Sequence, residues 1–226
     1  MSDESKTAAV AASDAPASED GTDAVAAFYG ETTAAAYAST MDEEMKTYFA
    51  DLDVFMADLV EGPVLDTSAG SGHMLQYLHE KMPERTLHGS DLSADMVAVA
   101  KKKCPSAAIT VGDMRDLSAW ESGTVAGLIS TFALHHVGED DARKCLGEWG
   151  RVLKPGGRSY IALWEGSGSM DMPPLPDGRV INAFNYAFAD VEKWLAAAGF
   201  KTVLSRTAKY EEFDANMAFF VVARDA

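Results

Sequence analysis

Two aspartates have the most informative spacing in this chain of 226 residues. Asp66 ends an apolar run and is followed by a turn of small residues, TSAGSG at 67–72, whose glycines leave the backbone open to a ligand. Asp91 ends the next apolar run, about nineteen residues after Gly72. In a parallel sheet this spacing suits an acid that accepts hydrogen bonds from the ribose of a bound nucleoside. We therefore expect a nucleoside cofactor across these two strand ends.

Two kinds of nucleoside cofactor fit this arrangement, a dinucleotide and S-adenosylmethionine. A dinucleotide turn reads G-x-G-x-x-G, and counted from Gly70 its third glycine falls on Leu75, which is too large. The carboxylate of Asp66 would repel a pyrophosphate but would attract a ligand that carries an ammonium and a sulfonium. The residues favour S-adenosylmethionine, and the alternative is a turn that merely connects a strand to a helix.

Further motifs follow this turn in a regular order. They are Asp113-Met114 after the run 107–111, TFALHHV at 131–137 after a run that starts at Val125, and LKPGG at 153–157 before the run 158–164. Together with the acidic turn, these motifs resemble those of the class I S-adenosylmethionine-dependent methyltransferases, in the branch that acts on small molecules. The resemblance covers roughly residues 23–224, and it departs from the family pattern at Ser68, where glycine is usual.

From residue 62 onward, apolar runs alternate with helix-like stretches, which predicts a parallel sheet with helices on both faces. The expected strands are 63–67, 86–90, 107–111, 125–131, 158–164, 200–207 and 217–223, and the expected helices are 72–81, 93–103, 139–152 and 188–198. No helix separates the last two strands, so the resemblance implies an antiparallel C-terminal hairpin strand. The predicted fold is an α/β, doubly wound, seven-stranded and mostly parallel sheet.

The composition divides the chain into three parts. Residues 1–22 are rich in Ala, Ser, Asp and Glu and contain no aromatic residue, so we expect a disordered acidic tail. Residues 23–61 read as two or three helices that form an N-terminal cap or lid, and residues 62–226 form the Rossmann-like methyltransferase domain.

The resemblance implies a role for each residue of the cofactor motifs. Asp66 would lie near the methionine ammonium, Asp91 would accept from both ribose hydroxyls, and Asp113 would accept from the adenine amine. For the last two, the alternatives are an acid in the first turn of a helix and a simple turn residue. The residues expected to wall or cover the cofactor are Ser68, Ala69, Gly70, Gly72, Leu92, Met114, Thr131, Phe132, Tyr29 and Tyr37.

Methyl transfer from a sulfonium is an in-line displacement that needs alignment of the reacting atoms and no metal ion. His135 and His136 follow the fourth predicted strand, where one of them can act as a general base or bind the substrate, and the alternative is that both are structural. An acceptor pocket is expected from Trp164, Glu165, Asn185 and Tyr186 together with Tyr29 and Tyr37, and the alternative is that Trp164 and Tyr186 are ordinary core aromatics. Such an aromatic and acidic lining would suit a cationic or amine acceptor.

The chain contains 35 acidic and 19 basic residues, a net charge of −16, so we expect no nucleic acid partner. It has no stretch of eighteen apolar residues, so no membrane span is expected. Cys104 and Cys145 read as free thiols in the cytoplasm. The predicted function is methyl transfer to a small molecule by a monomer or homodimer. The alternatives are aminopropyl transfer from a related cofactor and a non-catalytic, cofactor-binding regulatory protein.

Overall fold

The computed structural model describes residues 21–172, 174–211 and 214–225, without the side chains of residues 42–43. The predicted tail therefore lies outside the described residues, except at its end. Thr22, which was assigned to the tail, is the first residue of helix α1, Thr22–Phe28. The helical cap thus begins one residue earlier than predicted.

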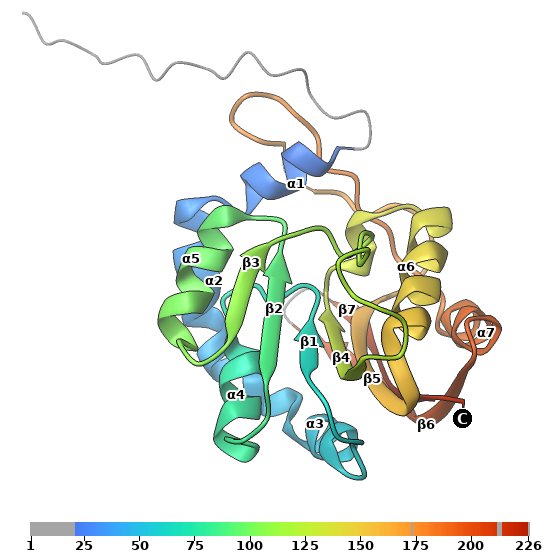
Figure 1. Ribbon diagram of the computed structural model, residues 1–226. Coiled ribbons are helices and arrows are strands. Elements are labelled where there is room, and N and C mark those ends of the chain that lie inside the picture. Colours follow the sequence, from blue (N-terminus) through green and yellow to red (C-terminus); the bar gives the residue numbers. More distant parts are fainter. Residues whose placement is uncertain (1–20, 173, 212–213, 226) are drawn as a thin grey trace, which may run out of the picture.

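Within the described residues, one seven-stranded sheet has the order β3-β2-β1-β4-β5-β7-β6 (Figure 1). Its strands are β1 Val64–Asp66, β2 Leu87–Asp91, β3 Ala108–Val111, β4 Val125–Thr131, β5 Leu153–Glu165, β6 Phe200–Tyr210 and β7 Ala215–Arg224. Strands β1 to β5 pair in parallel, and β7 lies antiparallel between β5 and β6. The predicted fold class, with its C-terminal hairpin strand, is confirmed.

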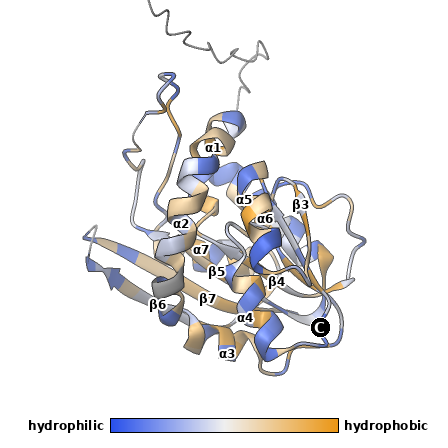
Figure 2. Ribbon diagram, turned by 90° about the vertical axis from the view of Figure 1, so that its left-hand side faces the viewer, coloured by the Kyte–Doolittle hydropathy of each residue, from blue (hydrophilic) through white to orange (hydrophobic). Residues whose placement is uncertain are grey.

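Helices cover both faces of this sheet (Figure 1). They are α1, α2 Glu31–Glu44, α3 Phe49–Met56, α4 His73–Lys81, α5 Ala94–Lys103, α6 Glu139–Val152 and α7 Phe188–Ala197, with the short 3-10 helices η1 Met45–Thr47 and η2 Leu134–His136. One apolar core lies between the sheet and α2 to α5, and a second lies between the sheet and α6 and α7. Burial on both faces explains why the central strands read as continuous apolar runs, as the hydropathy colours show (Figure 2).

Local sequence sets the ends of several helices. Ser93 caps α5, because its hydroxyl accepts a hydrogen bond from the Met96 N–H at 3.2 Å. Gly199 follows α7 with a φ of 84°, a conformation that glycine adopts without strain. In the parts of the chain that the structure describes, no helix is both long and apolar enough to span a bilayer.

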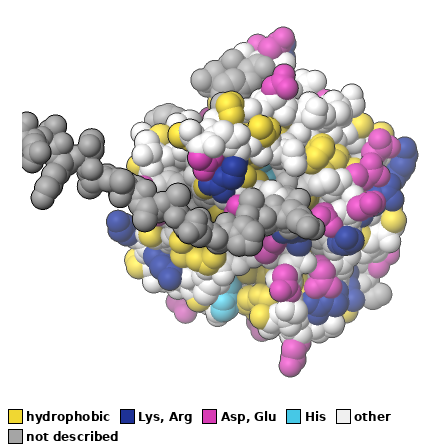
Figure 3. All heavy atoms as spheres, turned by 90° about the horizontal axis from the view of Figure 1, so that it is seen from above, with side chains coloured by type: hydrophobic (Ala, Val, Ile, Leu, Met, Phe, Trp, Pro, Cys, Tyr) yellow, Lys and Arg dark blue, Asp and Glu magenta, His cyan; other side chains and the backbone are white. Residues whose placement is uncertain are grey.

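The cap and one long connection meet at the C-terminal ends of the parallel strands. Helix α1 and the segment between β5 and α7 both rise at this end (Figure 1). One ion pair, of Arg179 with Asp23, joins that segment to α1, and a second, of Arg179 with Asp177, lies within the segment. Basic side chains lie beside acidic ones in the view from above (Figure 3). This is the edge at which doubly wound sheets bind ligands.

Candidate active site

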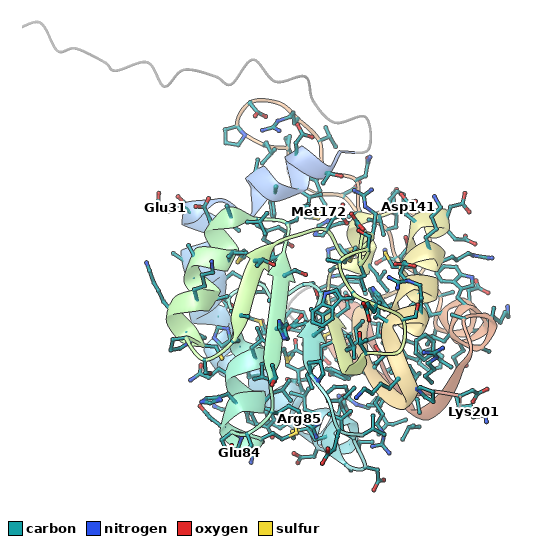
Figure 4. The ribbon with its side chains drawn as sticks, in the orientation of Figure 1. Glu31, Glu84, Arg85, Asp141, Met172 and Lys201 are labelled. Carbon is teal, nitrogen blue, oxygen red and sulfur yellow. The ribbon has the colours of Figure 1, made fainter. Side chains whose placement is uncertain are left out.

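A cavity of about 270 Å³ lies between the C-terminal ends of β1 to β4 and helix α1. Its walls come from the turns after these strands, from Asp141 near the start of α6, and from the segment between β5 and α7. The labelled side chains Asp141 and Met172 lie at the same end of the molecule as α1 (Figure 4). The residues that surround this space therefore come from distant parts of the chain.

Asp91 and Gly70 form the central contact of this site. The Gly70 N–H donates to Oδ2 of Asp91 at 2.8 Å, and the Ser93 N–H donates to Oδ1 at 2.9 Å. These bonds fix the carboxylate in the cavity wall, and each oxygen keeps capacity for a further hydrogen bond. Burial raises the pKa of Asp91, and the backbone N–H groups of Ser93, Gly70 and Leu92 oppose that rise. The carboxylate thus lies in the cavity wall, and its ribose role stays a prediction.

The serine at position 68 ties the first turn to the end of β4. Its hydroxyl lies 3.3 Å from that of Ser130 and accepts a hydrogen bond from the Thr131 N–H at 3.1 Å. Both Ser68 and Thr131 line the cavity, as predicted for the cofactor wall. The departure from the usual glycine therefore supplies a link between two strand ends.

The three small residues of the turn have different surroundings. Gly70 lines the cavity with a φ of 50°, and a Cβ there would lie 3.6 Å from the Tyr37 ring. Gly72 faces α5, where an added Cβ would lie 2.9 Å from Cα of Ala100. Ala69 is 5% exposed and packs in the core below the turn. The predicted cofactor role of Ala69 and Gly72 is corrected, since both serve packing.

Asp66 lies below the cavity wall with 1% of its surface exposed. Its Oδ1 accepts a hydrogen bond from the Ser68 N–H at 3.1 Å. Burial raises the pKa of Asp66 to about 7, the Ser68 N–H opposes this rise, and the nearby charge of Asp91 adds to it. Asp66 therefore does not touch a ligand in the cavity. When it is ionised, its negative charge attracts a cationic ligand through the cavity wall.

Asp113 is engaged by the arginine that follows it. Its carboxylate accepts from the Arg115 N–H at 2.9 Å and from the Arg115 guanidinium at 2.6–3.1 Å. Four hydrogen bonds fill the acceptor sites of a carboxylate, so the predicted bond from the adenine amine is not supported. Arg115 also donates to the hydroxyl of Thr22 at 2.7 Å and lies 3.7 Å from Asp141. Asp113 thus anchors an arginine that joins α1 to α6.

Leu92 and Met114 line the cavity as predicted, Leu92 half-buried and Met114 buried in the second core. Phe132 also lines it and takes a φ of 49°, an uncommon conformation for a bulky residue. Its ring packs against Trp164 at 5.1 Å between centroids. Packing in the first core therefore holds the backbone that turns away from β4.

Tyr29, Tyr37 and His136 form an aromatic cluster in the cavity wall. The Tyr29 hydroxyl lies 3.1 Å from Nε2 of His136, and its ring meets that of Tyr37 edge-on at 6.4 Å. The backbone carbonyl of Tyr29 accepts from the Ser93 hydroxyl at 2.7 Å. Burial lowers the pKa of His136 to about 4, so its ring is neutral near pH 7.

His135 does not reach the cavity. It is 4% exposed, its ring lies 3.9 Å from that of His136, and burial and His136 hold its pKa well below the ordinary value. Its backbone carbonyl accepts from the Phe184 N–H at 2.8 Å. The catalytic role predicted for His135 is therefore corrected to a supporting one behind His136.

Of the residues predicted to form an acceptor pocket, Tyr29 and Tyr37 line the cavity, whereas the other four do not. Trp164 packs against the first core, whereas Tyr186 is 7% exposed in the second core and donates to the Val137 carbonyl. Glu165 accepts from the Asn216 side chain at 3.2 Å, and the Asn185 N–H donates to Gly168. The backbones meet, because the Tyr186 N–H donates to the Trp164 carbonyl at 3.3 Å and Tyr186 forms a β-bridge with Glu165. Successive strand residues face opposite sides of a sheet, so the partner of Glu165 points away from the ring of Trp164.

The sequence reasoning missed several residues of the cavity wall. They are Val25, Ala26, Arg115, Asp141, Asn182 and Phe184. Arg115 had a local signal, because it lies two residues after Asp113. Asp141 lies in the first turn of α6, and the others lie in the short helix α1 and an irregular connection, where periodicity gives no information about orientation.

The donor and acceptor set fits S-adenosylmethionine. The fixed carboxylate of Asp91 suits a ribose diol, and the buried Asp66 and the acidic wall suit a ligand that carries an ammonium and a sulfonium. The apolar side chains of Leu92 and Met114 suit an adenine ring between the ends of β2 and β3.

Comparisons with known proteins agree with this geometry. The model of the family described as a methyltransferase domain matches residues 64–157. An uncharacterized methyltransferase of Bacillus cytotoxicus is 29% identical over 125 residues, which cover 54% of this chain and 57% of that protein. The chain thus spans just over half the length of the curated relatives it matches.

Two solved structures share the fold at low identity. The S-adenosylmethionine-dependent methyltransferase of Methanosarcina mazei has a TM-score of 0.65 and 17% identity, covering 77% of this chain and 96% of that one. The Burkholderia thailandensis 1,6-didemethyltoxoflavin-N1-methyltransferase, with bound 1,6-didemethyltoxoflavin and S-adenosylhomocysteine, has a TM-score of 0.64 and 18% identity, covering 94% and 93%. The matched segment identifies residues 64–157 as a methyltransferase domain, and the sheet has the fold that these S-adenosylmethionine-dependent methyltransferases share.

Proposed function

We propose that this chain transfers a methyl group from S-adenosylmethionine to a small-molecule acceptor without a metal ion. The observation that carries the proposal is the Asp91 carboxylate, fixed in the cavity wall by the N–H groups of Gly70 and Ser93. A small acceptor is supported by the modest volume of the cavity, about 270 Å³, and by the roof that α1 places over it.

S-adenosylmethionine, when bound, would supply a methyl group from its sulfonium. The rest of the cofactor is the leaving group and is a neutral thioether. The residues of this chain bind and align the cofactor. Asp91 holds the ribose, the buried carboxyl of Asp66 favours the positive end, and α1 with Tyr29 and Tyr37 excludes water from the reacting atoms. Most of the rate enhancement would then come from alignment.

Calorimetry with S-adenosylmethionine, S-adenosylhomocysteine and NAD tests the cofactor. We expect micromolar binding of both S-adenosyl ligands and none of NAD. Asp91→Ala should weaken this binding by about 1.5–3 kcal/mol, the range for hydrogen bonds to a charged group. Asp116→Ala is the control, because Asp116 is exposed and lies outside the cavity wall. Equal loss in both variants would contradict the site.

Incubation with a metabolite mixture separates the three activities. Methyl transfer releases S-adenosylhomocysteine, aminopropyl transfer from the decarboxylated cofactor releases methylthioadenosine, and a regulatory binder releases neither. The expected result is S-adenosylhomocysteine with one methylated product. Release of methylthioadenosine, or no turnover with intact binding, would refute methyl transfer as the function.

A further inference from the structure

The cavity has two halves that differ in charge. The half over β1, β2 and β3 carries the carboxylates of Asp91 and Asp113. The other half is formed by α1, the turn after β4 and the segment between β5 and α7, through Val25, Ala26, Tyr29, His136, Asn182 and Phe184. These six side chains are uncharged near pH 7, since burial keeps His136 neutral.

The carboxylates at the border between the halves are already paired. Asp113 is held by Arg115, and Asp141 lies 2.8 Å from Lys144 and 3.7 Å from Arg115. An acceptor in the uncharged half therefore meets no charged side chain from that half, and the carboxylates of Asp113 and Asp141 beside it are neutralised by their partners. Moving an unpaired charge from water into such an environment costs several kcal/mol.

The uncharged half holds one hydrogen-bonded pair, the Tyr29 hydroxyl and Nε2 of His136, 3.1 Å apart. Burial, and to a smaller extent the charge of Asp91, raises the pKa of Tyr29 well above the ordinary value, so its hydroxyl keeps its proton near pH 7. The pair can accept a hydrogen bond from a ligand and pass a proton inward to the imidazole. Nδ1 of His136 is buried and has no hydrogen-bond partner among the described residues. The backbone of Asn182 raises the pKa of this ring, but burial lowers it by more.

We propose that the acceptor is an uncharged aromatic or heteroaromatic compound whose ring O–H or N–H binds the Tyr29–His136 pair. This inference rests on the proposed function, because it assigns the charged half to the cofactor and the uncharged half to the acceptor. It replaces the cationic acceptor that the sequence suggested, since the acidic Glu165 and the aromatic Trp164 and Tyr186 of that predicted pocket lie outside the cavity.

The chemistry of the pair selects a ring donor over an aliphatic alcohol. A buried imidazole with a pKa near 4 is a weak base, so it suits an acidic donor. The pKa of a phenolic O–H is near 10, roughly six units below the pKa of water, so a phenol gives up its proton far more readily than an aliphatic hydroxyl. Aromatic walls from Tyr29 and Phe184 also favour a flat ring.

The step balances without a further reactant. The acceptor proton moves to the Tyr29 oxygen as the Tyr29 proton moves to Nε2 of His136. The freed electron pair of the acceptor forms the bond to the methyl carbon, and the carbon–sulfur bond breaks with its pair on sulfur. The imidazolium then returns its proton through Tyr29 to water.

Three compounds with the same ring system test the charge preference: 1-naphthol, 1-naphthoate and 1-naphthylmethylammonium. Their affinities are measured by calorimetry at pH 7.5 with saturating S-adenosylhomocysteine. We expect 1-naphthol to bind at least about tenfold more tightly than either ion, because a buried unpaired charge costs more than the 1.4 kcal/mol that this factor represents. Tighter binding of either ion, or no binding of 1-naphthol, overturns the inference.

A variant tests the hydrogen-bonding pair directly. The wild type should prefer 1-naphthol over 1-methoxynaphthalene, which cannot donate, by about fivefold, the value of one net hydrogen bond. Tyr29→Phe should remove this preference, whereas Tyr77→Phe, the control on α4 outside the cavity wall, should keep it. An unchanged preference in Tyr29→Phe overturns the inference.

The proton path is tested with S-adenosylmethionine and 1-naphthol. His136→Gln should slow formation of 1-methoxynaphthalene by about 10²-fold or more while 1-naphthol affinity stays within a fewfold. Equal rates in the two proteins overturn the proton path. Failure of S-adenosylhomocysteine to bind at all refutes the proposed function itself and is recognised before any acceptor is added.

Discussion

Replacing Asp66 by asparagine should stabilise the cofactor-free protein at neutral and alkaline pH. Asp66 is buried, and its pKa rises from 3.8 in the unfolded chain to about 7 in the fold. Because the folded state holds this proton more tightly, stability from Asp66 is complete below pH 3.8 and is lost as the pH rises to about 7.

The magnitude follows from the size of the shift. A rise from 3.8 to about 7 is about three pKa units, and at 1.36 kcal/mol per unit the ionised carboxyl costs about 4 kcal/mol above pH 7. Asparagine keeps the shape and an oxygen for the Ser68 N–H, so the variant should avoid most of this cost. Near pH 4.5 the folded wild type carries a neutral group at this position, as the variant does, so the variant's advantage should be smallest at this end of the range.

Urea denaturation of both proteins between pH 4.5 and pH 8 measures this difference. The free energy of unfolding of the variant, minus that of the wild type, should grow by several kcal/mol across this range. Asp116→Asn, in which the replaced group is exposed and its pKa is lowered by Ser118, should show no such growth. A constant difference for Asp66→Asn would refute the reasoning, because Asp66 would then ionise at the same pH in both states.

Three further changes test other parts of the structure. Gly72→Ala should destabilise the fold by at least about 2 kcal/mol, because its φ is 85° and the added Cβ meets the backbone of α5 at 2.9 Å. Gly147→Ala, on the open surface of α6, should instead stabilise the fold by about 0.5–1 kcal/mol in the same urea titration. Arg206→Met should cost about 3–5 kcal/mol because it leaves Asp51, 2% exposed, without its ion pair, and Asp51→Leu added to it should recover most of the loss in denaturant unfolding. The thiol of Cys145 is buried and its pKa is raised to about 12, so Ellman's reagent should modify it only after unfolding, and rapid reaction in the native state would contradict this.

The sequence predicted the strands well because burial and chain direction act over short segments. The predicted run 125–131 is β4 without any change of bounds, since each residue faces an apolar core on one side or the other. The turn after β1 was also predicted, and so was the position of Asp91 beside it, because both follow from strand ends in a parallel sheet.

The sequence could not predict which way side chains face once the strands end. Gly72 supports packing on α5, and the spacing of the glycines does not distinguish this role from contact with a ligand. Asp113 is engaged by Arg115, and only the short separation of these two residues indicated it. Trp164 at the end of β5 and Tyr186 before α7 looked like one pocket because both are aromatic, yet they belong to different cores. Long-range pairing decides such cases, as with the Tyr29 hydroxyl and His136, which are 107 residues apart.

The cavity is built from two separable parts of the chain. Its floor comes from the strand ends within residues 64–157, the segment that the methyltransferase family model matches. Its roof comes from α1 on one side of that segment and from Asn182 and Phe184 on the other, and the ion pair of Asp23 with Arg179 joins the two sides. Under the proposed function, exchange of these two flanking pieces with those of a related enzyme would alter the acceptor and leave the methyl donor in place, so the specificity of this molecule could be transplanted.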